Sequence, residues 1–135
     1  MAPLGQAFFD AAKLPGQFDV TRFVRGWERI LRARSGVVVG YFDDAGELRG
    51  GAGAYITPDV MTTDTVAYES FFYVEPAFRG RGTALLKSLE EACRLEGANR
   101  LWMIHLADER ADVMRRYYER QGFVLAEYLY RKDLK

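Results

Sequence analysis

The stretch that decides the fold of this chain is YVEPAFRGRGTA, residues 73–84. It begins at the end of an apolar and aromatic run that predicts a strand, and it ends where a helical pattern of apolar residues starts. Glycines at 80 and 82 allow a ligand to come close to the backbone, and the first N–H groups of a helix have no partner within the helix. The stretch therefore predicts an anion site at a helix start, with added positive charge from Arg79 and Arg81. The competing interpretation is that the two glycines only form a tight turn.

Apolar periodicity on either side of this stretch predicts the other elements. Residues 5–34 predict two helices separated at Pro15-Gly16, with Asp19 or Thr21 capping the second. Runs at 36–42 and 51–57 predict a hairpin, and 66–74 predicts a third strand. There follow a helix over about 80–97, a strand over 101–106, a helix that ends at Gly122 and a strand over 123–130. This order predicts one α/β (α+β) domain, 1–135, with a helical pair in 1–35 and a mixed sheet flanked by helices in 36–135.

The composition excludes several classes of function. The 19 basic residues balance the 19 acidic ones, which argues against a nucleic-acid-binding protein. One His and one Cys are too few for a zinc site, so we expect no metal. A single Cys indicates a reducing compartment, and the sequence predicts neither a transmembrane helix nor a secretory signal. We therefore expect a cytoplasmic protein without membrane or nucleic-acid partners. The signatures of P-loop and Rossmann nucleotide sites are also missing from the sequence.

Two motifs resemble the signatures of a known family. Arg79-x-x-Gly82-x-Ala84 matches the [QR]-x-x-G-x-[GA] pattern of the GNAT (Gcn5-related N-acetyltransferase) superfamily, and it lies between a strand and a helix as it does there. The segment 118–123, YERQGF, is similar to that family's Y-E-x-x-G-F pattern. The resemblance covers about residues 36–131 and implies a mostly antiparallel sheet. A narrower similarity is to short phage and prophage members.

The resemblance implies acetyl-CoA as co-substrate and direct transfer of its acetyl group to a primary amine in a ternary complex. The pyrophosphate would lie on the loop and helix start, and the pantetheine would run along the end of the preceding strand. The residues implied in cofactor binding are Phe72, Tyr73, Val74, Arg79, Gly80, Arg81, Gly82, Thr83 and Ala84.

The reaction itself requires a base, an acid and an oxyanion donor. An amine must lose a proton before it attacks, and the departing thiolate must gain one. Tyr118, the tyrosine of the second motif, is the candidate acid, ahead of its neighbour Tyr117. Glu69 is the first candidate base: strand alternation would place 69, 71 and 73 on one face, although a surface or edge position without a catalytic role is the alternative. His105 on the strand 101–106 is the rival base, unless it is only a packed, hydrogen-bonded core residue. A backbone N–H near Phe72 or Tyr73 would stabilise the oxyanion.

The sequence leaves other functions open. Many family members have an asparagine seven residues before the motif tyrosine, where this chain has Ala111. That departure favours, as the alternative, a non-catalytic acyl-CoA sensor or interaction module of the same fold. A third interpretation is a scaffold that binds no cofactor. The acceptor, a small molecule or a protein amine, is not identified by the sequence, and a monomer and a homodimer are both compatible with it.

Overall fold

The computed structural model describes residues 1–134, and its contacts divide the chain into two compact units. The first unit runs from Met1 to Met103 and contains the sheet, while the second begins at Ile104. Each unit is described here by itself.

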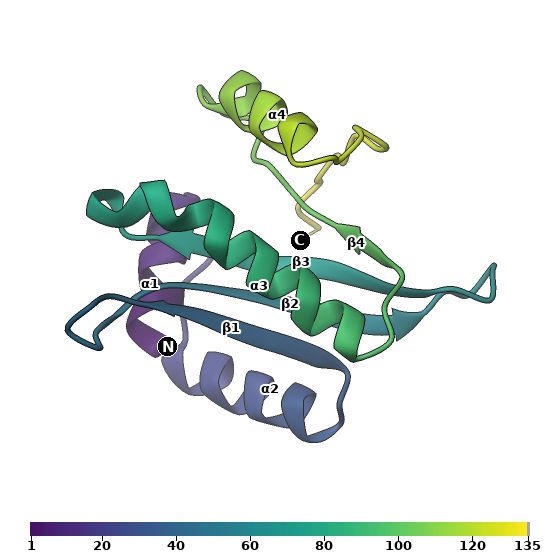
Figure 1. The fold of residues 1–135 in the computed structure, drawn as a ribbon, viewed down its shortest axis with the longest axis horizontal. Coiled ribbons are helices and arrows are strands. Elements are labelled where there is room, and N and C mark those ends of the chain that lie inside the picture. Colours follow the sequence, from purple (N-terminus) through teal and green to yellow (C-terminus); the bar gives the residue numbers. More distant parts are fainter. Residues whose placement is uncertain (135) are drawn as a thin grey trace. The chain divides into compact units, whose positions relative to one another are not determined.

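The first unit is built on a four-stranded sheet in the order β1-β2-β3-β4 (Figure 1). Its strands are β1 (Gly36–Phe42), β2 (Leu48–Pro58), β3 (Thr65–Val74) and β4 (Arg100–Trp102). The first three strands pair antiparallel, and β4 lies parallel to β3. This arrangement confirms the predicted mixed, mostly antiparallel sheet.

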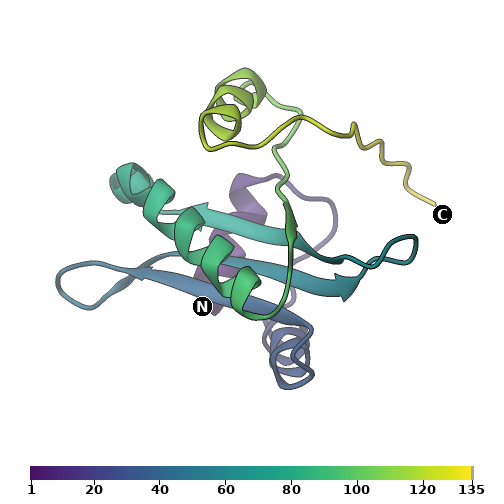
Figure 2. The ribbon, with the colours of Figure 1, turned by 45° about the vertical axis from the view of Figure 1, so that its right-hand side comes forward.

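Helices cover both faces of this sheet (Figure 2). α1 (Ala2–Ala11) and α2 (Val20–Arg32) lie on one face, and α3 (Gly82–Leu95) lies on the other, after the 3-10 helix η1 (Pro76–Arg81). The start of α2 is capped as predicted, because the Asp19 carboxylate accepts a hydrogen bond from the N–H of Arg22 at 2.9 Å.

Small residues in β2 allow the core to close on both faces. Toward α3, Ala52 and Ala54 are fully buried in a core that includes Leu85 and Leu89 of the helix. Toward α2, a Cβ on Gly53 would come within 2.5 Å of the Phe71 ring and 2.8 Å of the Trp27 ring. Phe71 also contacts rings of α1 and α2, so an aromatic cluster forms the second core.

The second unit contains the helix α4 (Ala111–Arg120). Gly122 follows it with a φ of 89°, so the predicted helix end is confirmed. No helix within residues 1–134 has both the length and the apolarity that crossing a bilayer requires.

Two predicted strands differ from the structure. The strand expected over 101–106 ends at Trp102, and the segment 123–130 forms no strand among the described residues. Val124 and Tyr130 are 84% and 96% exposed. Alternating apolar residues suit a strand, but a strand exists only where another strand accepts its hydrogen bonds, and the local pattern does not contain that information.

Candidate active site

A β-bulge at Ser70 lies in the middle of β3. Phe71 pairs with Gly53, whereas Glu69 pairs with Ala54, so Ser70 is an extra residue without a partner on β2. Cross-strand partners share a face. Glu69 therefore lies on the α3 side with Ala54, while Phe71 lies on the α2 side, where its ring is 5.4 Å from that of Trp27.

The prediction that residues 69, 71 and 73 share one face is therefore wrong. The extra residue reverses the alternation between Glu69 and Phe71. Of the alternative positions for Glu69, a surface position is wrong as well, because the residue is only 6% exposed. The structure thus presents a buried carboxylate beside the bulge.

Next to the bulge, β3 and β4 separate. Their parallel register runs from Val66–Arg100 to Tyr68–Trp102 and then stops. Within residues 1–103, no strand pairs with the β3 edge between 69 and 74 on the side away from β2. Backbone groups of Phe72, Tyr73 and Val74 on such an edge can hydrogen-bond an extended ligand as an added strand would.

The loop after β3 is open above both of its glycines. A Cβ on Gly80 or Gly82 would meet no atom within 4 Å, and neither residue has a positive φ. Neither the turn nor the packing therefore requires glycine, which argues against the tight-turn interpretation. Arg79 and Arg81 are exposed, and the N-cap residue Arg81 makes no side-chain capping hydrogen bond within residues 1–134. These features fit a bound anion such as a pyrophosphate.

A cluster of charged side chains that the sequence motifs did not predict lies at the start of this loop. Arg49 Nε donates to Asp43 Oδ2 at 2.8 Å, and its Nη1 lies 3.3 Å from Glu75 Oε2. Its guanidinium also lies 5.2 Å from the centre of the Phe78 ring. The hydrogen bond from Arg49 holds the pKa of Asp43 below its ordinary value. No local motif reveals this cluster, because its members come from the hairpin, β2, the end of β3 and η1.

Tyr118 and His105 both lie in the second unit, whereas Glu69 lies in the first. The Tyr118 hydroxyl donates a hydrogen bond to the Ile104 carbonyl at 3.1 Å, and its side chain is buried. The Tyr118 ring also packs against Phe123 and, at 6.4 Å, against the ring of His105. His105 follows the end of β4 instead of lying in a strand, and its buried Nδ1 has no hydrogen-bond partner among residues 1–134.

Cys93 has the environment of a structural residue. It is nearly fully buried in α3, and desolvation, followed by the charge of Glu90, raises its pKa from 9.0 to about 11. A thiol with so high a pKa is a poor nucleophile near neutral pH. Within residues 1–134, no group of His, Cys, Asp and Glu is arranged to hold a metal ion.

Comparison with family models supplies the decisive observation. The model of the Acetyltransferase (GNAT) family matches residues 6–123, which include both sequence motifs. The chain belongs to this family. Acetyl-CoA is therefore its co-substrate, and acetyl transfer is its class of reaction.

Solved structures share the GNAT fold at low sequence identity. An aminoglycoside acetyltransferase from an uncultured soil metagenomic sample is 21% identical, with a TM-score of 0.75 over 99% of this chain and 87% of its own. AAC(6')-Iy, in complex with a CoA-containing bisubstrate analogue, is 23% identical, with a TM-score of 0.74 over 98% of this chain and 89% of its own. A glucosamine-6-phosphate N-acetyltransferase from Arabidopsis thaliana is 15% identical, with a TM-score of 0.72 over 100% of this chain and 95% of its own. No curated protein sequence matches the chain.

Proposed function

We propose that this GNAT protein transfers the acetyl group of acetyl-CoA directly to a primary amine, in a ternary complex and without a covalent enzyme intermediate. One observation carries the proposal: the end of β3, whose outer edge pairs with no strand within residues 1–103, leads into a loop whose two glycines have open space above them. In this proposal residues 1–135 act as one domain, with 1–35 and 36–135 as its helical and cofactor-binding parts.

The cofactor would be held mainly by backbone groups. The pyrophosphate would lie on the loop and the first turn of α3, with Arg79 and Arg81 supplying charge. The pantetheine would pair with the open edge of β3 at Phe72–Val74, and an N–H of this edge would stabilise the oxyanion. The residues proposed for this site are Phe72, Tyr73, Val74, Arg79, Gly80, Arg81, Gly82, Thr83 and Ala84.

Glu69 is the proposed base. Its burial beside the bulge supports this role. Burying a carboxylate costs free energy of desolvation, and an apolar side chain could fill a purely structural position in the strand without that cost. His105 is the competing base, and the observation in its favour is its buried Nδ1, which has no hydrogen-bond partner in the described part of the chain. Either group would take the proton of the attacking amine, directly or through water.

Tyr118 is the proposed acid. Its phenol is oriented by the hydrogen bond to the Ile104 carbonyl, and its ring is held by Phe123. The CoA thiolate that leaves needs a proton or a hydrogen-bond donor, and the phenol of Tyr118 could supply either. Proton donation from the phenol would then complete the release of CoA.

Thermal unfolding with acetyl-CoA, and with ATP and NAD as controls, tests the cofactor site. A ligand at about 100 times its Kd raises the free energy of unfolding by about 2.7 kcal/mol, which is a readily visible shift in Tm. We expect a shift with acetyl-CoA alone, followed by release of CoA thiol when a primary amine is added. No shift at millimolar acetyl-CoA would contradict the site. Binding without CoA release over a broad panel of amines would support a sensor instead.

A further inference from the structure

The side chain of Arg49 links three segments that meet where the chain leaves β3. Its Nε donates a hydrogen bond to Asp43 Oδ2 at 2.8 Å, in the turn between β1 and β2. Its Nη1 lies 3.3 Å from Glu75 Oε2, directly after β3, and its guanidinium lies 5.2 Å from the centre of the Phe78 ring in η1. One planar group therefore contacts the hairpin turn, the end of β3 and η1 at the same time.

Backbone hydrogen bonds connect the same residues. The N–H of Glu75 donates to the Arg49 carbonyl at 2.9 Å, and the N–H of Phe78 donates to the Glu75 carbonyl at 2.8 Å. At the other end of the cluster, the Asp43 carboxylate also accepts two backbone hydrogen bonds within its own turn. Arg49 thus connects the residues that begin η1 to a turn that is itself held by hydrogen bonds.

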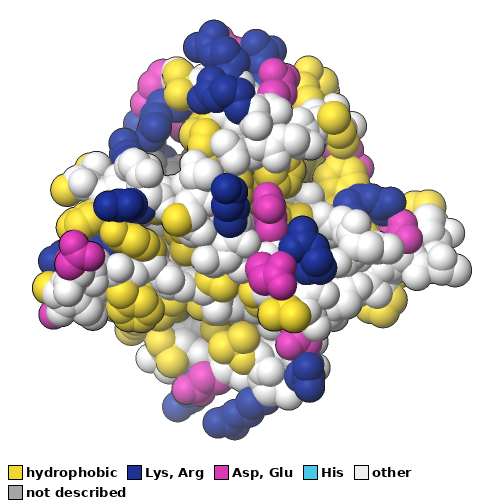
Figure 3. Space-filling view, viewed as in Figure 1, with side chains coloured by type: hydrophobic (Ala, Val, Ile, Leu, Met, Phe, Trp, Pro, Cys, Tyr) yellow, Lys and Arg dark blue, Asp and Glu magenta, His cyan; other side chains and the backbone are white. Residues whose placement is uncertain are grey.

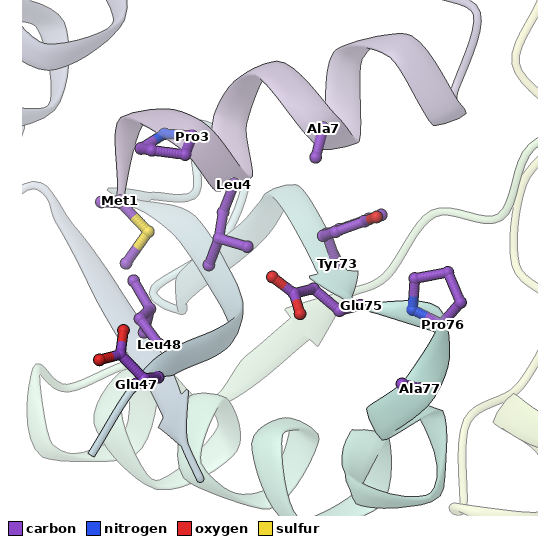
Figure 4. A pocket seen from close by; sticks show the side chains of 10 residues that line it. All are labelled: Met1, Pro3, Leu4, Ala7, Glu47, Leu48, Tyr73, Glu75, Pro76 and Ala77. Atoms are coloured by element: carbon purple, nitrogen blue, oxygen red, sulfur yellow. The ribbon is translucent and has the colours of Figure 1, made fainter. Parts of the chain in front are cut away.

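Open space lies on one side of Glu75. Its side chain lines a pocket of about 660 Å³ between α1 and the adjoining ends of β2 and β3, where Leu4 and Glu47 also lie (Figure 4). Figure 4 also shows η1 beginning directly after Glu75. Because packing is incomplete on the pocket side, the ion pair with Arg49 restrains the Glu75 side chain from the other side.

The charges of this cluster do not favour an anion by themselves. The pyrophosphate site proposed a few residues further along the chain is an anion site, yet the cluster combines two carboxylates with one guanidinium. Basic and acidic side chains are also interspersed over α3 (Figure 3), where their fields partly cancel. Anion binding at the start of α3 then depends on the exact placement of a few donors, which are the first N–H groups of the helix and the side chains of Arg79 and Arg81.

We propose that Arg49 is a positioning residue for acetyl-CoA: it holds the start of η1 against the β1–β2 turn, so that residues 79–84 keep the conformation that receives the pyrophosphate. This proposal rests on the proposed placement of the pyrophosphate on this loop. Arg49 acts through Glu75 and Phe78 and does not contact the cofactor. A loop that is already held in its binding conformation loses less conformational entropy when the ligand binds. If the loop had this conformation for only about a tenth of the time, the apparent Kd would rise about ten-fold.

Calorimetric titration of the full chain with acetyl-CoA tests this role. We expect Arg49→Met to raise the Kd about ten-fold. Arg49→Lys should raise it about three-fold, because one ammonium cannot contact both carboxylates and lie flat on the ring. Arg34→Met is the matched control, since Arg34 also pairs with a glutamate at 3.3 Å but does so beside the C-terminal ends of α2 and α3, and it should leave the Kd unchanged. Unchanged affinity in both Arg49 variants would overturn the proposal.

The two carboxylates separate positioning from a direct effect of charge. Asp43→Asn and Glu75→Gln each remove a negative charge near an anion site, so electrostatics alone predicts tighter binding of acetyl-CoA. Positioning predicts the opposite: each variant should raise the Kd about three- to ten-fold. Because Arg49 and Glu75 act as one unit, Arg49→Met combined with Glu75→Gln should bind no more weakly than Arg49→Met alone. Tighter or unchanged binding in both carboxylate variants would overturn the proposal.

Kinetics distinguish positioning from a general loss of structure. With a primary amine that the wild type acetylates, Arg49→Met should raise the KM for acetyl-CoA about ten-fold and keep kcat at saturating acetyl-CoA within about two-fold. The KM for the amine should stay unchanged. A fall in kcat with an unchanged KM for acetyl-CoA would contradict positioning. Thermal unfolding of each variant shows that the fold is retained.

Failure of this proposal is distinguishable from failure of the proposed function. Arg79→Ala removes a charge that is proposed to contact the pyrophosphate, so it should weaken acetyl-CoA binding by itself. If Arg79→Ala weakens binding and the Arg49 and Glu75 variants do not, the cofactor site stands and the positioning role alone is overturned. If the wild type does not bind acetyl-CoA, the proposed site fails, and the role of Arg49 fails with it.

Discussion

Glu69 and Phe71 stand two residues apart on β3, yet their side chains lie on opposite faces of the sheet. The extra residue Ser70 causes this, because Glu69 pairs with Ala54 and Phe71 pairs with Gly53. The same bulge lies next to the point where β4 leaves β3, after the Tyr68–Trp102 pair. One inserted residue thus coincides with a buried carboxylate on one face, an aromatic core on the other and an open strand edge beside them.

The aromatic core depends on a glycine. We predict that Gly53→Ala lowers the free energy of unfolding by about 1–3 kcal/mol, because its Cβ would lie 2.5 Å from the Phe71 ring and both neighbouring rings belong to a packed core. Urea denaturation measures this difference. A variant as stable as the wild type would show that the Phe71 and Trp27 rings move aside freely.

Gly82 should behave in the opposite way. It has helical backbone angles, and a Cβ there meets no atom within 4 Å, so Gly82→Ala should raise the free energy of unfolding by up to about 1 kcal/mol. The added methyl group would occupy the space proposed for the pyrophosphate, and we expect acetyl-CoA to bind at least ten-fold more weakly. Calorimetry measures the binding, and unchanged affinity would remove Gly82 from the proposed site.

The choice between the two bases can be made from pH–rate profiles. Glu69→Gln preserves the shape of the side chain but cannot accept the proton, so we expect kcat to fall by about 10²–10⁴-fold, with loss of the profile's acidic limb. His105→Ala, tested in parallel, should leave this limb in place. If His105→Ala alone removes it, His105 is the base, and if neither variant alters the profile, neither residue has this role.

Tyr118→Phe separates a chemical role from a structural one. Removing the hydroxyl loses the hydrogen bond to the Ile104 carbonyl, and we expect a cost of about 1 kcal/mol in stability. If Tyr118 is the acid, kcat falls by a much larger factor than the lower stability of the variant explains. Binding of acetyl-CoA is retained. Full kcat in the folded variant would assign the hydroxyl to structure alone.

Burial of Cys93 predicts a dependence of stability on alkaline pH. The folded thiol has a pKa of about 11, against an ordinary value of 9.0, so the unfolded chain releases this proton first as the pH rises. The contribution of the buried Cys93 thiol to the free energy of unfolding is complete below pH 9 and is lost between about pH 9 and 11. Denaturation curves of the wild type and Cys93→Ala across this range should show a steeper decline for the wild type. Parallel declines would contradict the raised pKa.

Patterns within single elements were predictable from the sequence. The apolar stripe of α3 lies in the core, Asp19 caps α2, and Gly122 follows α4 with a positive φ. Each of these features depends on residues within a few positions of one another. The order of helices and strands up to α4, and the motif at 79–84, were recognisable for the same reason.

Relations between distant residues were decided only by the tertiary structure. Whether Ser70 is inserted opposite β2, where β4 leaves β3, and whether 123–130 finds a partner strand all depend on pairing between segments far apart in the chain. The pocket of Glu47, Glu75 and Leu4 likewise assembles from three separate elements. The sequence by itself determined the order of elements up to α4, through local periodicity, and the family motifs, through the identity of a few neighbouring residues. The tertiary structure decided which faces, edges and charges meet, because register and packing are properties of pairs of segments and not of any one of them.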